Sequence, residues 1–147
     1  PILTKNQLSE MSASGMEIAS HSWNHADLTK VRDNVLKKEV EVSKLELERI
    51  IGTEVSSFAY PYGLFEDRTI EALKKAGYTK ACTTKTGWLG SDADPFRIRR
   101  VAIFNHDTLS SFARKIAFAD TEVSWKDIAG YMKRRLAARC KSQRFRK

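Results

Sequence analysis

Two of the three histidines in this chain, His21 and His25, stand four residues apart in the segment Ser-His-Ser-Trp-Asn-His at positions 20–25. Imidazole is the usual nitrogen ligand for zinc and similar ions, so two such side chains can bind one ion if the backbone turns between them. A histidine at a helix start and a second one at the surface would give the same pattern. The pair directly follows a predicted strand at residues 16–20, which favours the interpretation of His21 and His25 as metal ligands.

A second candidate motif, Phe-Ala-Tyr-Pro-Tyr-Gly, occupies residues 58–63 at the end of another predicted strand. One interpretation is a buried strand that an aromatic-Pro-Gly turn brings to an end. The other is a rigid platform whose backbone amides donate hydrogen bonds to an oxyanion and whose aromatic ring faces a sugar. The residues of this motif alone leave both interpretations open.

The elements that must position these residues alternate between helical and strand patterns. A capping box formed by Thr4 and Gln7 starts the first predicted helix, which ends near Gly15. Gly52 and Gly77 are predicted to end two later helices. Apolar spacing predicts helices at residues 29–51, 66–76, 108–119 and 125–139, and strands at residues 16–20, 55–60, 78–84 and 96–104. Because strands that alternate with helices pair in parallel, the sequence predicts an α/β fold with function at the carboxyl ends of its strands.

The composition excludes several classes of protein. The 147 residues are 41% hydrophobic, which is enough for one domain with a core. No apolar run approaches the roughly 20 residues that a membrane-spanning helix needs. The two cysteines, Cys82 and Cys140, do not indicate a disulfide framework, and their number excludes a metal site built from cysteines alone.

The net charge of +8 comes from the C-terminal end of the chain. The last 17 residues contain eight basic side chains and no acidic one, while the rest of the chain holds 18 of each sign. Such a tail can bind an anionic polymer or a membrane surface, and it can equally be the solvated end of a helix. Because the body of the chain is neutral and carries no recognised nucleic-acid-binding motif, we expect no specific binding to nucleic acid.

The histidine motif, the amphipathic helix after it and the Phe-Ala-Tyr-Pro-Tyr-Gly motif together resemble the polysaccharide deacetylase family, also called the NodB-homology or carbohydrate esterase family 4 group. With the flanking segments, the resemblance covers residues 4–120. It implies an α/β fold that is a partial or distorted (β/α) barrel. We therefore expect a truncated deacetylase domain at residues 1–120, followed by a helix and a basic tail at residues 121–147.

The resemblance also implies a function and roles for five residues. The function is the hydrolysis of acetyl groups on carbohydrate polymers with the help of a divalent metal ion, commonly zinc. His21 and His25 would bind the metal ion. The backbone amide of Tyr62 would help to bind the oxyanion, and Tyr60 and Pro61 would shape the adjacent substrate-binding wall. Members of the family are often exported or attached to the cell envelope, and the compartment of this chain stays open.

The chain departs from the family pattern in one respect. The family's first motif, of Thr-Phe-Asp-Asp type, supplies the catalytic base and a third metal ligand, and no Asp-Asp pair occurs in this sequence. Asp27 and Asp33 follow the histidines instead of preceding them. We therefore expect the first strand-helix units of the barrel to be missing, so that one copy of this chain cannot assemble a complete deacetylase site.

Two alternative functions remain. One is a non-catalytic relative that binds carbohydrate or metal, and the other is a basic module that binds polyanions. A parallel edge exposed by missing strands predicts a homodimer, because such edges pair readily. His106 stands in what resembles a short loop before a helix, so we do not assign it the role of the histidine that many family members carry near the end of the domain.

Overall fold

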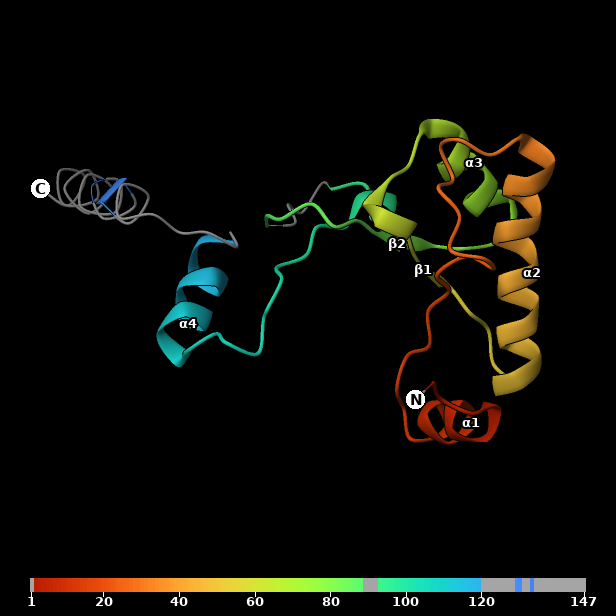
Figure 1. Cartoon of the computed structure of the whole chain (residues 1–147), viewed down its shortest axis with the longest axis horizontal. Helices are drawn as coiled ribbons and strands as arrows, with labels where there is room; N and C mark the ends of the chain where they lie inside the picture. Colours follow the sequence, from red (N-terminus) through yellow and green to blue (C-terminus); the bar gives the residue numbers. More distant parts are fainter. Residues whose placement is uncertain (1, 89–92, 120–128, 131–132, 134–147) are drawn as a thin grey trace, which may run out of the picture. The chain divides into compact units, whose positions relative to one another are not determined.

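The structure is a computed structural model, which describes residues 2–88, 93–119, 129, 130 and 133. It divides into two compact units, Pro1–Arg100 and Val101–Lys147 (Figure 1). The described part of the second unit contains α4 (Leu109–Phe118). The described part of the first unit contains helices, strands and 3₁₀ turns: α1 (Lys5–Ala13), α2 (Asp33–Ile51), β1 (Ser57–Ala59), the turn Pro61–Gly63, α3 (Asp67–Lys75), β2 (Lys80–Cys82) and the turn Pro95–Arg97.

The strands pair in parallel. In the β1–β2 pair, Phe58 lies opposite Ala81. Single parallel bridges extend this pair on both sides, from Ser20 to Phe58 and from Cys82 to Ile98. The predicted parallel α/β architecture is therefore confirmed. Because parallel strands end at the same edge of a sheet, the residues that follow Ser20, β1 and β2 are brought to one edge.

All four predicted strands are shorter than expected: those at residues 55–60 and 78–84 become the three-residue strands β1 and β2, and the other two become single bridges. The strand expected at residues 16–20 is reduced to the bridge at Ser20, because the backbone nitrogen of Met16 is still bonded to the end of α1 through the carbonyl of Met11 (3.1 Å). The strand expected at residues 96–104 is reduced to the bridge at Ile98. Here Pro95 opens a 3₁₀ turn that the side chain of Asp94 caps, which takes the backbone out of the extended conformation.

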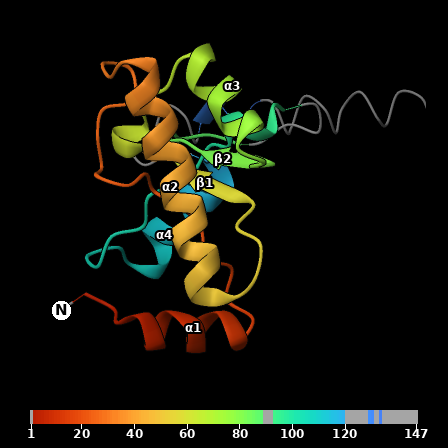
Figure 2. The same ribbon diagram turned by 90° about the vertical axis from the view of Figure 1, so that its right-hand side faces the viewer.

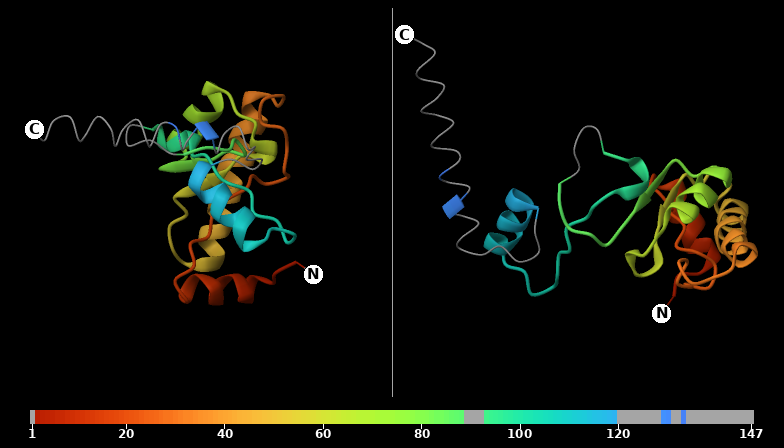
Figure 3. Two further views of the ribbon diagram at one scale, coloured as in Figure 1. Left: turned by 90° about the vertical axis from the view of Figure 1, so that its left-hand side faces the viewer. Right: turned by 90° about the horizontal axis from the view of Figure 1, so that it is seen from above.

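The core lies between the helices and the strands. Figures 2 and 3 show α2 along one side of β1 and β2, and Figures 1 and 2 show α1 at the C-terminal end of α2. Leu36 and Val40 of α2 belong to a buried apolar cluster with Phe58 of β1, Leu73 of α3 and Tyr78. Burial of side chains of this size contributes about 1.5–3 kcal/mol each, so this cluster is the main attachment of the helices to the strands.

Helix α2 ends where the sequence predicts but begins later. Its C-cap, Gly52, adopts the left-handed conformation with φ 72°. The predicted start at residue 29 is wrong, because Asp27 accepts hydrogen bonds from the backbone nitrogen (3.1 Å) and the hydroxyl (2.6 Å) of Thr29 and so forms a turn there. Arg32 is still extended (φ −70°, ψ 157°), and the helix starts at Asp33.

The remaining helices confirm their predicted ends. Thr4 and Gln7 form the capping box of α1, and Gly77 follows α3 with φ 83°. At the start of α4, the side chain of Thr108 accepts a hydrogen bond from the backbone nitrogen of Ser111. Most of the helix expected at residues 125–139, and the domain boundary expected at residue 120, lie outside the described residues. In the part of the chain that the structure describes, no helix is long and apolar enough to cross a membrane.

Candidate functional site

Ser20, the residue before His21, is fixed by hydrogen bonds to both β1 and α2. The backbone nitrogen of Ser20 donates to the carbonyl of Ser57 (3.0 Å), and the backbone nitrogen of Ala59 donates to the carbonyl of Ser20 (2.8 Å). The buried hydroxyl of Ser20 also donates to the hydroxyl of Ser43 in α2 (2.8 Å). The chain therefore reaches His21 from a point that both β1 and α2 fix.

The side chain of His21 bonds back to the end of β1. Its Nδ1 lies 2.7 Å from the carbonyl oxygen of Ala59. Because a carbonyl oxygen only accepts hydrogen bonds, Nδ1 carries the proton in this contact, and the neutral ring keeps a lone pair on Nε2. Metal-binding imidazoles are commonly oriented by such a bond from the other ring nitrogen to a backbone carbonyl. The contact therefore gives His21 the tautomer that a metal ligand needs.

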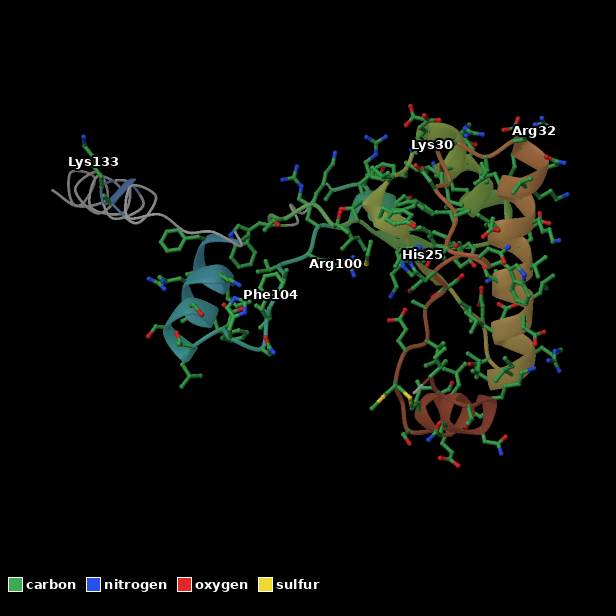
Figure 4. All side chains as sticks on the ribbon, viewed as in Figure 1. His25, Lys30, Arg32, Arg100, Phe104 and Lys133 are labelled. Carbon is green, nitrogen blue, oxygen red and sulfur yellow. The ribbon has the colours of Figure 1, made fainter. Side chains whose placement is uncertain are left out.

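His25 connects the two sequence motifs in space. Its ring centroid lies 4.8 Å from that of His21 and 4.6 Å from that of Tyr62, and both contacts are edge-to-face. The three side chains are exposed, and Figure 4 shows His25 on the connection that leads toward α2. Two motifs that are separated by the whole of α2 in the sequence thus meet at one edge of the strands.

The step from His21 to His25 uses a strained backbone. Ser22 has φ 65° and His25 has φ 55°, so both adopt the left-handed conformation. This conformation costs a residue with a side chain about 1–2 kcal/mol, and it persists only where neighbouring groups stabilise it. The reversal of the loop that brings the two imidazoles together therefore requires support from another element.

The support comes from Glu39 of α2, which sequence analysis did not identify. Its Oε2 accepts hydrogen bonds from the backbone nitrogens of Trp23 (3.0 Å) and Asn24 (2.7 Å), and its Oε1 accepts one from Nδ2 of Asn24 (2.7 Å). Burial alone would raise the pKa of Glu39, but the hydrogen bonds from Asn24 and Trp23 bring the pKa below its ordinary value. The available signal is an acidic residue between Leu36 and Val40 on the buried face of α2.

The second motif ends in a tight turn around Tyr62. Tyr62 has φ 57° and ψ 4°, and Gly63 has φ 70°. The backbone nitrogen of Gly63 donates to the carbonyl of Tyr60 (2.9 Å), and the hydroxyl of Thr84 makes a long hydrogen bond to the carbonyl of Tyr62 (3.4 Å). The side chain of Tyr62 is 61% exposed. The turn therefore holds an accessible aromatic ring beside His25.

Tyr60 and Pro61 lie beneath this turn. Both residues are buried, and the hydroxyl of Tyr60 donates to the carbonyl of Phe96 (2.9 Å). The ring of Tyr60 stacks on that of Phe65 with 4.6 Å between centroids. Burial raises the pKa of Tyr60 above its ordinary value, so the hydroxyl remains a hydrogen-bond donor. These two side chains support the wall at Tyr62 from the inside.

The acidic residues that follow the histidines already have partners. Asp27 pairs with Lys30 at 2.8 Å, and hydrogen bonds from Lys30 and Thr29 lower the pKa of Asp27 to about 2. Asp33 pairs with Arg68 at 2.9 Å. Among the described residues, no group of three or more His, Cys, Asp or Glu side chains could hold a metal ion. This part of the chain therefore offers two imidazoles, a donor type that suits zinc, and no third ligand beside them.

His106 and Asp94 make other contacts. His106 belongs to the second unit, where its ring stacks on Phe104 with 5.4 Å between centroids. The side chain of Asp94 accepts a hydrogen bond from the backbone nitrogen of Phe96 (2.9 Å), which makes Asp94 a capping residue.

Comparisons with known proteins agree with this geometry. A family model described as polysaccharide deacetylase matches residues 3–81. The poly-β-1,6-N-acetyl-D-glucosamine N-deacetylase of Staphylococcus epidermidis is 30% identical over an alignment of 113 residues, which covers 71% of this chain and 39% of that protein.

Two solved structures are also similar. The deacetylase PplD of Streptococcus pyogenes, in complex with acetate, has 26% identity and a TM-score of 0.71, over 76% of this chain and 50% of that one. The polysaccharide deacetylase BC0361 of Bacillus cereus has 34% identity and a TM-score of 0.70, over 78% of this chain and 36% of that one. The chain thus spans half or less of the length of these relatives.

The matched region takes in the histidine motif, all of α2 and the turn at Tyr62, which are the parts that meet at the strand ends. The predicted family is therefore confirmed, and the chain belongs to the polysaccharide deacetylase family.

Proposed function

We propose that this chain forms part of a metal-dependent hydrolase that removes acetyl groups from a carbohydrate polymer. The observation that carries the proposal is the cluster at the strand ends, where the rings of His21, His25 and Tyr62 are in contact. Membership of the family supports the reaction class, and the name of the staphylococcal relative supports an N-acetylated amino sugar as the substrate. Since the chain spans half or less of its relatives, the proposal concerns the part of the site that these residues supply.

His21 and His25 are the proposed metal ligands, and zinc is the proposed ion. The proton on Nδ1 of His21 bonds to the carbonyl of Ala59, so Nε2 is the nitrogen that would bind the ion. A bound divalent ion would activate a water molecule and polarise the acetyl carbonyl. Catalytic zinc sites use three protein ligands, so at least one further ligand would have to come from residues other than the two histidines.

The turn at Tyr62 is the proposed oxyanion site. The backbone amide of Tyr62 would donate a hydrogen bond to the oxygen that gains negative charge when water adds to the acetyl carbon. The left-handed backbone of Tyr62 and Gly63 and the buried side chains of Tyr60 and Pro61 would keep this amide in one orientation. Tyr60 and Pro61 would also shape the wall against which the sugar lies.

A second candidate function is a non-catalytic relative that binds metal or carbohydrate. It is favoured by one observation, which is that the described residues bring no carboxylate together with the two histidines as a third ligand or base. The two candidates differ in one measurable property, because only the hydrolase releases acetate.

Titration of the chain with zinc, measured by isothermal calorimetry, tests the proposed metal site. We expect binding by the unaltered chain and by His106→Ala, which removes the one remaining histidine, and loss of binding in the double variant His21→Ala/His25→Ala. Unchanged binding in the double variant, or none in the unaltered chain, would contradict the site. Acetate release from a polymer of N-acetylglucosamine, measured on a zinc-loaded protein in which a Thr-Phe-Asp-Asp-type segment is added to this chain, would support the hydrolase, and zinc binding without release by that protein would favour the second candidate.

A further inference from the structure

The loop between the two histidines has only one charged group buried against it in the described structure. Glu39 is 3% exposed, and both of its carboxylate oxygens accept hydrogen bonds from the loop. The three donors are two consecutive backbone nitrogens, those of Trp23 and Asn24, and the side-chain amide of Asn24. Hydrogen bonds to a charged acceptor are stronger than those between neutral groups, so this contact is the main polar attachment of the loop to α2.

The carboxylate itself is held in place by the core. Glu39 lies on the buried face of α2, where its neighbours Leu36 and Val40 pack in the apolar cluster. One turn further along, Ser43 accepts the hydrogen bond from Ser20, the residue before His21. The rigid helix α2 therefore bonds to the chain both immediately before the first histidine and between the two histidines.

We infer that Glu39 is a positioning residue, which sets the distance between the imidazoles of His21 and His25 by fixing the backbone of Trp23 and Asn24. The inference rests on the proposed metal site. Without the carboxylate, three part-buried donors would lose their acceptor, and the left-handed residues Ser22 and His25 would relax toward the favoured regions of backbone conformation. The two rings, now 4.8 Å apart, would then no longer be held for one ion.

Three variants test this role. Glu39→Ala removes the acceptor, and Glu39→Gln keeps the shape of the side chain but replaces one carboxylate oxygen with a donor. Asn24 can compensate in Glu39→Gln by turning its amide, so we expect this variant to be intermediate. Glu41→Gln is the matched control, because Glu41 lies on the same helix and, among the described residues, makes only a long 3.9 Å ion pair with Lys37.

Two measurements separate positioning from general stability. The first is the affinity for zinc by calorimetry, which we expect to fall about 10- to 100-fold in Glu39→Ala and to stay unchanged in Glu41→Gln. The second is hydrogen exchange of the amides of Trp23 and Asn24 by NMR, without metal. We expect exchange of these two amides to become at least about tenfold faster in Glu39→Ala, while amides in β1 and α3 keep their protection.

The outcomes distinguish this inference from the proposed function. If the unaltered chain binds no zinc, the proposed metal site fails, and the exchange of the two amides still decides whether Glu39 fixes the loop. If Glu39→Ala keeps both the zinc affinity and the amide protection of the unaltered chain, the inference is overturned. If Glu39→Ala does not fold, Glu39→Gln decides in its place, and unchanged affinity and exchange in that variant would overturn the inference.

Discussion

Gly63 occupies a position in the turn at Tyr62 where only glycine fits. Its φ is 70°, and a Cβ atom there would lie 2.7 Å from the backbone nitrogen of Thr84, closer than real Cβ contacts. Thr84 follows β2, so the clash would be with backbone and could not be relieved by turning a flexible side chain. The orientation of the Tyr62 amide therefore depends on a residue with no side chain next to it.

Gly63→Ala and Gly52→Ala form a matched pair for testing this point. Both positions have nearly the same φ, 70° and 72°, but nothing lies within 4 Å of a Cβ atom at Gly52. The left-handed conformation alone would cost each variant about 1–2 kcal/mol in free energy of unfolding. We expect the free energy of unfolding to fall at least about 1 kcal/mol more in Gly63→Ala than in Gly52→Ala, as measured by urea unfolding that is monitored by circular dichroism. Equal losses would show that the contact with Thr84 is not tight.

Asp107 stabilises the second unit through three hydrogen bonds. Its carboxylate accepts from Nζ of Lys115 (2.7 Å), from the backbone nitrogen of Phe104 (2.7 Å) and from the hydroxyl of Ser111 (2.9 Å). The hydrogen bond from Lys115, followed by that from Phe104, lowers the pKa of Asp107 to about 2. Both partners of the ion pair are at least nine-tenths buried.

The pH dependence of this contact follows from the direction of the shift. The pKa of Asp107 is lower in the folded chain than the value of about 3.9 of an unfolded aspartate, so its stabilisation is complete above about pH 5. It is lost as the pH falls from about 4 to about 2. We expect hydrogen exchange to show that the protection of amides in α4 declines over this window in the unaltered chain. In Asp107→Asn, the protection should be lower at neutral pH and should depend less on pH. Asp67→Asn, at an exposed ion pair, is the control.

At the scale of elements, one arginine joins the segment after the histidine motif to α3. Arg68 donates hydrogen bonds to the backbone carbonyls of Leu28 (3.2 Å), Thr29 (2.8 Å) and Val31 (2.9 Å). Its guanidinium also pairs with Asp33 at the start of α2. A single side chain thus bonds three backbone carbonyls of the connection that leads from His25 into α2.

Arg68→Ala should loosen this connection. We expect a clear fall in melting temperature and faster hydrogen exchange in residues 28–33, because several backbone carbonyls lose their donor together. Arg49→Ala is the control, since Arg49 is an exposed residue of α2 whose ion pair in the described part of the chain is with Glu46, one turn away. Its effect should be small. A loss in Arg68→Ala no greater than that in Arg49→Ala would contradict the role of Arg68.

The elements also show how far the sequence predicts the fold. The ends of helices depend on residues beside them, so the capping box at Thr4 and the stop at Gly52 were predictable. The start of α2 was not, because Arg68 stabilises the non-helical turn from far along the chain. Strand length was overestimated at residues 96–104, since apolar character alone does not reveal the 3₁₀ turn that begins at Pro95.

The candidate site also has features that the sequence predicts and features that it does not. That the histidine motif and the Tyr62 turn would meet followed from their positions after parallel strands, which need only short-range patterns to predict. The role of Glu39 depends on which face of α2 packs against the loop, and a buried glutamate on an apolar stripe carries no signal of its partner. The roles of His21, His25 and Tyr62 in binding metal and oxyanion stay predictions.

At the scale of the whole molecule, charge is divided between the two units. Residues 101–147 carry eleven of the 26 basic and four of the 18 acidic side chains, so this unit has a formal net charge of +7, against +1 for residues 1–100. The proposed site lies in the nearly neutral unit, and the excess of positive charge lies in the other. Binding of polyanions and binding of zinc should therefore be separable.

Deletion of residues 131–147 tests this separation. With short duplex DNA as a probe polyanion, we expect weak, sequence-independent binding by the full chain, with an affinity that falls steeply as salt is raised. The deletion removes eight basic residues and should abolish this binding while zinc affinity stays the same. Salt-dependent DNA binding that survives the deletion would place the polyanion site in the body of the chain.

Self-association is a further prediction at this scale. Ser20 pairs with β1 on one side, and the described residues place no strand on its other side. Exposed edges of this kind pair with other strands, so we expect a homodimer. Light scattering over a range of protein concentrations measures the mass directly, and a monomer mass throughout would contradict this prediction.

The placement of Trp23 between the two histidines has an optical consequence. Its side chain is 46% exposed, while its backbone nitrogen is bonded to Glu39. The other two tryptophans of the chain are Trp88 and Trp125, and changing both to phenylalanine would leave a single indole fluorophore, on the loop between the proposed metal ligands. A sugar that packed against this indole would shift its emission to shorter wavelength, and a copper ion bound by the neighbouring imidazoles would quench the emission. The fluorescence of Trp23 would therefore report the binding of sugar or metal at the proposed site.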